Sequence, residues 1–433
     1  MKRAKLLIKH AEQIVQVCAN NEDMLVGEAM KNIAVMKPEE GTSGLSLVID
    51  REGNIADFGT DAKLEAKYAN WSFENVLDAS GCCLLPGLVD AHTHPVWAGD
   101  RVHEFAMKLA GATYMEVHKA GGGINFTVEH TRNASEKELF VLFKERLQRM
   151  VKAGTTLVEC KSGYGLDVEN ELKMLRVIER ARRDDNINIE ISSTYCGAHS
   201  VPKGSTADET TDDVISKQIP AIKAEMEMGK LHVDNIDVFC EKGVFDIMQT
   251  RRILEEGVKA GWRINFHGDE LNPMKAAELG ADMKACAISH LEEISDNGIA
   301  AMASARSVAV ILPTTAYILR LRAPPVRKMI ESGVPMALGS DFNPNAFCLS
   351  MPLVMHLACV NLRMSMPEAI AASTINAAAS LGRSETHGSI EVGKRGNVLV
   401  IRAPKWEHLV YQLGGQNDII AAVVCRGKIA HQN

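Results

Sequence analysis

The sequence predicts an α/β fold, built around a TIM-like (β/α)8 barrel with β-rich segments at both ends of the chain. Three observations carry this prediction. Eight short apolar segments alternate with amphipathic helical segments between residues 85 and 391. Short strand-like segments separated by turns occupy residues 1–84. A similar pattern returns over residues 392–433.

Composition limits the class of protein. With 433 residues, 46% of them hydrophobic, the chain can bury a large core, and one barrel can absorb most of its length. A net charge of −7 disfavours a nucleic-acid partner, because such proteins usually present a basic face. The ten cysteines include no Cys-x-x-Cys pair and are expected to be reduced. Without a signal segment or a membrane-length apolar run, we expect a cytoplasmic protein with no membrane partner.

The first and last parts of the chain read as strands. Short apolar segments bounded by polar and turn residues predict strands over residues 6–9, 13–18 and 46–50, with a turn at Gly53 and Asn54. Near the other end, strands are predicted over residues 397–402 and 421–429.

The eight barrel strands are predicted in the middle of the chain. They are expected at residues 85–91, 155–160, 189–195, 235–240, 263–267, 287–290, 308–313 and 335–340. Segments between them, such as residues 171–182, carry apolar residues at helical spacing. An open, doubly wound sheet is the alternative, but the number and spacing of the strands favour a closed barrel.

His92 and His94 are the most informative pair in the chain. They end the first predicted barrel strand, where side chains two positions apart point to the same face. Two converging imidazoles supply half of a site for a first-row metal. A single His-x-His pair also arises by chance, so the prediction depends on further ligands downstream.

Further histidines and an acid occur at the ends of other predicted strands. In a barrel, catalytic groups gather at the carboxyl ends of the strands. His199 follows the third strand, His267 ends the fifth, His290 ends the sixth and Asp341 ends the eighth. We predict that His92, His94, His267 and Asp341 bind a metal and leave a place for water. Taken alone, His267 could be a core histidine, and Asp341 could cap the next helix.

This strand-by-strand pattern resembles the amidohydrolase superfamily. The resemblance implies a metal-dependent barrel over residues 85–391 and a composite β-sandwich domain formed by residues 1–84 and 392–433. Many members carry a carboxylated lysine on the fourth strand that bridges two metals. Lys242 is the only lysine near that strand end, and its Glu-Lys-Gly context favours an ordinary loop lysine. We therefore expect a mononuclear site that holds one zinc or iron ion.

Six motifs narrow the resemblance to the imidazolonepropionase family. They lie at residues 92–101, 159–166, 197–202, 267–270, 289–292 and 339–344. The resemblance implies hydrolysis of 4-imidazolone-5-propanoate to N-formimidoyl-L-glutamate in histidine degradation. Another amidohydrolase activity, such as nucleobase deamination, is the alternative. By analogy with related barrels, a homodimer is expected.

The substrate chemistry assigns roles to individual residues. A propionate tail needs a fixed cation, and Arg101 can supply a bidentate contact. Tyr114 and Tyr164 are candidates to hydrogen-bond the ring or the tail. The resemblance also implies that His199 contacts the ring, and it makes product contacts at Asn343 plausible.

Three residues are predicted to act in catalysis. Glu270 is placed to take the proton of the attacking water and pass it to the leaving ring nitrogen. Its alternative role is that of an acid at a helix start. His290 is expected to stabilise the oxyanion. Asp341 could share the proton transfer with Glu270 while acting as a metal ligand.

Overall fold

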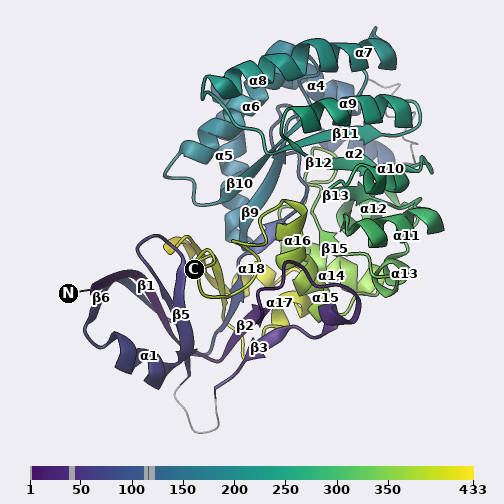
Figure 1. Cartoon of the computed structure of the whole chain (residues 1–433). Coiled ribbons are helices and arrows are strands. Elements are labelled where there is room, and N and C mark those ends of the chain that lie inside the picture. The colour runs from purple at the N-terminus through teal and green to yellow at the C-terminus, as the bar shows by residue number, and fades with distance from the viewer. Residues whose placement is uncertain (1, 39–43, 112–115, 117–121) are drawn as a thin grey trace.

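A parallel barrel forms the centre of the computed structural model, which describes residues 2–38, 44–111, 116 and 122–433 (Figure 1). Eight strands pair in chain order from β8 to β15. They are β8 (Leu88–Asp90), β9 (Thr155–Lys161), β10 (Glu190–Ala198), β11 (Asn235–Cys240), β12 (Arg263–Gly268), β13 (Ala287–His290), β14 (Val308–Ile311) and β15 (Met336–Leu338). Each one falls within or overlaps a predicted segment, so the prediction of eight barrel strands is confirmed.

The first and last barrel strands meet just beyond their carboxyl ends. Thr93 and Phe342 form a parallel bridge, and the amide of Asp341 donates to the carbonyl oxygen of His92 at 3.0 Å. The amide of His94 donates to the carbonyl oxygen of Phe342 at 2.8 Å. These contacts nearly close the barrel, so the alternative of an open sheet is wrong.

Helices cover the barrel between its strands (Figure 1). They include α2 (Val102–Leu109), α4 (Ile124–Asn133), α5 (Glu136–Lys152), α6 (Val168–Arg183), α7 (Ala207–Asp213), α8 (Ile219–Glu227), α9 (Ile247–Lys259), α10 (Ala276–Asp282), α11 (Asp296–Ala305), α12 (Pro313–Leu319), α13 (Val326–Glu331), α14 (Met351–Leu362), α15 (Met366–Ala372) and α16 (Ile375–Ser380). Helix α6 confirms the helical spacing over residues 171–182: its Leu172, Leu175 and Ile178 are buried. Asp167 caps its first turn. No helix among the described residues is long and apolar enough to cross a membrane.

The two chain ends share a sheet. A six-stranded sheet has the order β18-β17-β16-β7-β2-β3, and a four-stranded sheet has the order β5-β4-β1-β6. Their strands are β1 (Lys2–Ala11), β2 (Gln13–Val17), β3 (Ala34–Met36), β4 (Leu45–Ile49), β5 (Ile55–Thr60), β6 (Trp71–Asp78), β7 (Cys83–Pro86), β16 (Val398–Ile401), β17 (Ile420–Cys425) and β18 (Lys428–Gln432). Short helices accompany them: η1 (Gly27–Lys31), α1 (Asp61–Tyr68), α17 (His408–Tyr411) and α18 (Gln416–Ile419).

Strands β7 and β16 join the two ends of the chain. They pair antiparallel, with Leu85 opposite Leu399. A separate apolar cluster includes Leu6, Leu47 and Val424, so strands from both chain ends bury their side chains together. The strands predicted at both ends are present, except that residues 421–429 contain a turn at Arg426 and Gly427 that separates β17 from β18. The division into domains at residues 84/85 and 391/392 stays a prediction.

Glu190 ties the start of β10 to the segment that returns from the barrel. Its Oε2 lies 2.9 Å from His387 Nε2 and accepts a hydrogen bond from Asn397 Nδ2 at 2.7 Å. Burial raises the pKa of Glu190, but the hydrogen bond and charge of His387, together with Asn397, outweigh it and lower the pKa to about 2.

We predict that Glu190→Gln lowers the free energy of unfolding at pH 7 by on the order of 2 kcal/mol. The folded pKa lies below the ordinary value of 4.5, so the contribution of the carboxylate is present above that pH and is lost as the pH falls towards about 2. Urea unfolding at pH 7 and at a pH near 3 measures both effects. Equal unfolding free energies at pH 7 for the variant and the unchanged protein would contradict this role, and Glu52→Gln in an exposed turn is the control.

Candidate active site

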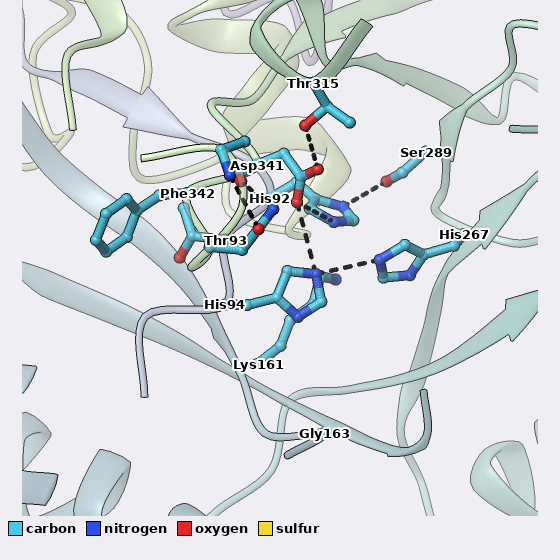
Figure 2. Close-up of polar contacts among 12 residues, drawn as sticks. His92, Thr93, His94, Lys161, Gly163, His267, Ser289, Thr315, Asp341 and Phe342 are labelled. Atoms are coloured by element: carbon cyan, nitrogen blue, oxygen red, sulfur yellow. Dashed lines mark hydrogen bonds and ion pairs between the residues drawn. The ribbon is translucent and has the colours of Figure 1, made fainter. Parts of the chain in front are cut away.

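Strand β8 directs a pair of histidines into the mouth of the barrel. The chain stays extended after Asp90 and places His92 and His94 there, both almost fully buried (Figure 2). His92 Nδ1 lies 2.8 Å from the hydroxyl of Ser289 at the end of β13. This contact orients the ring of His92 and leaves its Nε2 facing the neighbouring ligand candidates.

The four predicted ligands converge. His94 Nε2 lies 3.1 Å from His267 Nε2 and 3.6 Å from Asp341 Oδ1, and His92 Nε2 lies 3.5 Å from Asp341 Oδ1 (Figure 2). Ligands of one tetrahedral ion stand about 3.3 Å apart when metal–nitrogen bonds are about 2.0–2.1 Å. His92 Nε2 is buried and has no hydrogen-bond partner among the described residues. These observations fit a buried His/Asp metal site.

Asp341 is hydrogen-bonded to Thr315 and does not cap a helix. The Thr315 hydroxyl donates to Asp341 Oδ2 at 2.5 Å, which leaves Oδ1 facing the histidines. Helix α14, the next one along the chain, has Ser350 as its N-cap. The alternative role of Asp341 as a helix cap is therefore wrong.

His199 and His290 flank this cluster. The ring of His199 stacks on that of His94, with centroids 4.6 Å apart and an angle of 12° between the planes. His199 Nδ1 lies 2.9 Å from the carbonyl oxygen of Gly163, to which it can only donate. Burial is the main cause that lowers the pKa of His199 to about 3, so at neutral pH the ring is neutral and its Nε2 is a hydrogen-bond acceptor. His290 Nε2 lies 3.5 Å from Glu270 Oε2.

One cavity of about 420 Å³ opens onto the cluster. Its lining contains nine of the predicted site residues: His94, Arg101, Tyr164, His199, His267, Glu270, His290, Asp341 and Asn343. His92 lies behind this lining, against Ser289. Tyr114, the remaining predicted residue, lies outside the described residues.

Arg101 lines the cavity and forms an ion pair with Glu104. Its Nε and Nη2 donate to Glu104 at 2.8 and 2.7 Å, and Glu104 also accepts from the amide of Gly123. This fork fixes the orientation of the guanidinium, and the side chain of Arg101 lines the cavity. Lys108 lines the same cavity and contacts the side chain of Asn345. The resemblance and the chemistry of the substrate indicated Arg101 but neither Glu104 nor Lys108.

Glu270 has the environment of a proton-transfer group. Burial, followed by the nearby carboxylates of Glu292 and Asp341, raises its pKa well above the ordinary value. The neighbouring Asp269 caps α10 instead, accepting hydrogen bonds from backbone amides that include Ala276 and Ala277. The helix-start role considered for Glu270 therefore belongs to Asp269, which is buried.

Three buried residues beside the cluster were not predicted. They are Glu159 and Lys161 on β9 and Asp237 on β11, each at most 1% exposed. Two charged residues at positions i and i+2 of an apolar strand were the available signal, because both point into the barrel. Lys242, the lysine singled out from the sequence, is exposed, as expected of a loop lysine. The buried lysine beside β11 is Lys161, and it lies on β9.

The fold and the site together define a barrel hydrolase with a histidine and aspartate metal centre. The sequence profile of the amidohydrolase family matches residues 83–430. The chain is 63% identical to a mouse "Probable imidazolonepropionase" over 99% of both chains. It is 62% identical to the human protein of that name, covering 99% of this chain and 98% of the human one. The chain therefore belongs to the amidohydrolase family, within its imidazolonepropionase branch.

Solved structures agree with this fold. An adenosine deaminase from Xanthomonas campestris with bound zinc superposes with a TM-score of 0.72 at 16% identity, covering 99% of this chain and 93% of that one. A guanine deaminase from C. acetobutylicum reaches 0.68 at 16% identity, covering 98% and 99%. At such low identity the likeness concerns the fold alone.

We predict about one zinc or iron ion, divalent or trivalent, per purified chain, lost in His267→Ala and Asp341→Ala because each removes one ligand of four. Elemental analysis after gel filtration measures the metal content. The control is His356→Ala, because this half-buried histidine lies 2.9 Å from the carbonyl oxygen of Val410 and lines no part of the cavity. A full complement of metal in both ligand variants would contradict the assignment.

Proposed function

We propose that this chain hydrolyses 4-imidazolone-5-propanoate to N-formimidoyl-L-glutamate in histidine degradation. The observation that carries the proposal is one cavity that joins the His/Asp cluster, the proton-transfer candidate Glu270 and the anchored cation Arg101. Such a cavity suits a small cyclic amide with a carboxylate tail. Relatives that are 55–63% identical over nearly the whole chain carry the name of this activity.

The metal is proposed to be a single zinc or iron ion. His92, His94, His267 and Asp341 would hold it, since three imidazoles and a carboxylate suit either ion. When bound, the ion lowers the pKa of water, so that a nucleophile is available at neutral pH.

Each of the residues around the cavity is proposed to have its own role in the reaction. Water oxygen adds to the ring carbonyl carbon, and Glu270 takes the water proton. As the ring carbon–nitrogen bond breaks, Glu270 passes that proton to the leaving nitrogen, while Asp341 shares the proton transfer. His290 hydrogen-bonds the developing oxyanion. His199, with Nε2 as an acceptor, receives a hydrogen bond from a ring N–H.

The other polar residues position the substrate. Arg101 binds the propionate, with Lys108 as a second cation on the same side of the cavity. Arg101 is paired with Glu104, so Lys108 supplies a further positive charge that attracts the carboxylate of the tail. Tyr164 and Asn343 line the cavity and are proposed to contact the substrate, as is Tyr114.

Three further features are proposed on less direct grounds. The chain forms a homodimer, by analogy with related barrels, and light scattering that gives one monomeric mass would overturn this. It works in the cytoplasm. Its domains are the barrel over residues 85–391 and the composite β-sandwich of residues 1–84 and 392–433.

Nucleobase deamination is the alternative within the family. Both reactions would use the same activated water, but a deaminase needs no cation for a propionate and releases ammonia. An ammonia assay on imidazolone propionate and on purines therefore separates the two functions.

We predict that Arg101→Ala and Lys108→Met each raise KM for imidazolone propionate about 10- to 100-fold, with a smaller effect on kcat. The reason is that each variant removes a charge-assisted contact to the tail and leaves the reacting groups in place. Steady-state kinetics measure the change, and Lys242→Met at the exposed loop lysine is the control. A KM within a factor of two of the unchanged protein in both variants would contradict this tail site.

We predict that Glu270→Gln lowers kcat by about 10²- to 10⁴-fold, because the amide cannot carry the transferred proton. The variant should keep its metal and its KM. Turnover measured beside the metal content separates a lost proton transfer from a lost ligand. Glu293→Gln, next to the buried Glu292 but outside the cavity, is the matched control, and equal loss in both would refute the role.

A further inference from the structure

Three buried charged side chains lie next to one another behind the metal site. Lys161 Nζ lies 2.8 Å from Glu159 Oε2 and 2.7 Å from Asp237 Oδ2, and all three side chains are at most 1% exposed. Thr194 donates to the other oxygen of Glu159 at 2.6 Å. The ammonium group is thus enclosed between two carboxylates inside the barrel, so it is not free to reach a metal or a substrate.

Asp237 connects this lysine to a ligand. Its Oδ1 lies 2.9 Å from His267 Nδ1 and accepts from the backbone amide of His267 at 3.1 Å. A carboxylate whose other oxygen faces an ammonium group acts as an acceptor, so His267 Nδ1 carries a proton and donates it to Asp237. His267 Nε2 then keeps its lone pair, directed at His94 and the rest of the ligand set.

We propose that Lys161 is a positioning residue for the metal centre, acting through Asp237 to fix the ring orientation and tautomer of His267. Carboxylates that hold ligand histidines tune metal affinity in this way. Here the carboxylate is itself held by a lysine from the second barrel strand. Lys161 fixes which oxygen of Asp237 faces the ring.

Packing alone does not account for a lysine at this position. Burying charges is costly, and an apolar side chain of similar volume often replaces a buried ion pair at little cost in stability. Without the ammonium group, Glu159 and Asp237 would face each other as like charges, and Asp237 would no longer be held towards His267. The expected consequence is a loss of metal affinity that exceeds the general effect on stability.

The test measures zinc binding by the metal-free full chain, in competition with a chelator of known affinity. Lys161→Met should weaken zinc binding about 10- to 100-fold. The matched control is Lys394→Met, which removes another buried lysine, paired with Glu391 at 3.1 Å and remote from the cavity. That variant should lose stability but keep its zinc affinity. Thermal unfolding of each metal-free variant shows whether it is folded.

Two further variants separate positioning from a purely structural role. In Asp237→Asn, Lys161 should attract the amide oxygen and turn the amide N–H₂ towards His267, which forces the wrong tautomer and weakens zinc binding. In the double variant Lys161→Met/Asp237→Asn the amide is free to rotate, so zinc should bind at least as tightly as to Asp237→Asn alone. Glu159→Gln, which keeps the Lys161–Asp237 pair, should bind zinc within a factor of three of the unchanged protein.

Zinc affinity in Lys161→Met equal to that of the unchanged protein would overturn the proposal, as would losses that add in the double variant. If Lys161→Met fails to fold, the contrast between Asp237→Asn and Glu159→Gln still decides the matter, and equal affinities would count against it. The proposal rests on the metal site of the proposed function and not on its substrate. Because zinc binding is measured without substrate, failure to turn over imidazolone propionate would leave this result unaffected.

Discussion

The contact between the first and last barrel strands is the constraint on which the site depends. Asp90, at the end of β8, accepts hydrogen bonds from the amide and hydroxyl of Ser340 at 2.9 and 2.5 Å. The next residues then meet in register, with the amide of Asp341 on the carbonyl oxygen of His92. Asp90 and Ser340, which are 250 positions apart in sequence, are thereby brought together. If the contact between the first and last barrel strands were lost, Asp341 would separate from the histidines and the ligand set would be incomplete.

Burial gives the cluster its chemistry. It is the largest cause that lowers the pKa of both His92 and His94 well below the ordinary value, and neighbouring cationic groups add to it. The imidazoles are therefore neutral at physiological pH and have a lone pair to offer a metal. The same burial raises the pKa of Glu270, so a carboxyl group beside the cluster is suited to hold a proton between its removal from water and its delivery to a leaving group.

The fold and much of the candidate site could be predicted from local patterns. Short apolar segments that alternate with helical segments indicated the barrel strands, and the rule that barrel sites lie at carboxyl strand ends selected His267 and Asp341 from many candidates. Contacts between side chains of different strands cannot be predicted from the spacing of residues in the sequence. For this reason Asp237 under His267, Lys161 between two carboxylates and Lys108 beside Arg101 became visible only in three dimensions. Asp269 and Glu270 show the same limit, since adjacent acids divide into a helix cap and a cavity residue according to backbone geometry.

We propose that water adds to the carbonyl carbon of the imidazolone ring in this cavity and that the ring then opens. Turnover of imidazolone propionate in ¹⁸O-labelled water, followed by mass spectrometry of the product, tests it most directly. The expected product is N-formimidoyl-L-glutamate with one ¹⁸O in the newly formed carboxylate, without release of ammonia. A folded, metal-loaded protein that leaves the substrate unchanged, or that releases ammonia from it, would rule this reaction out.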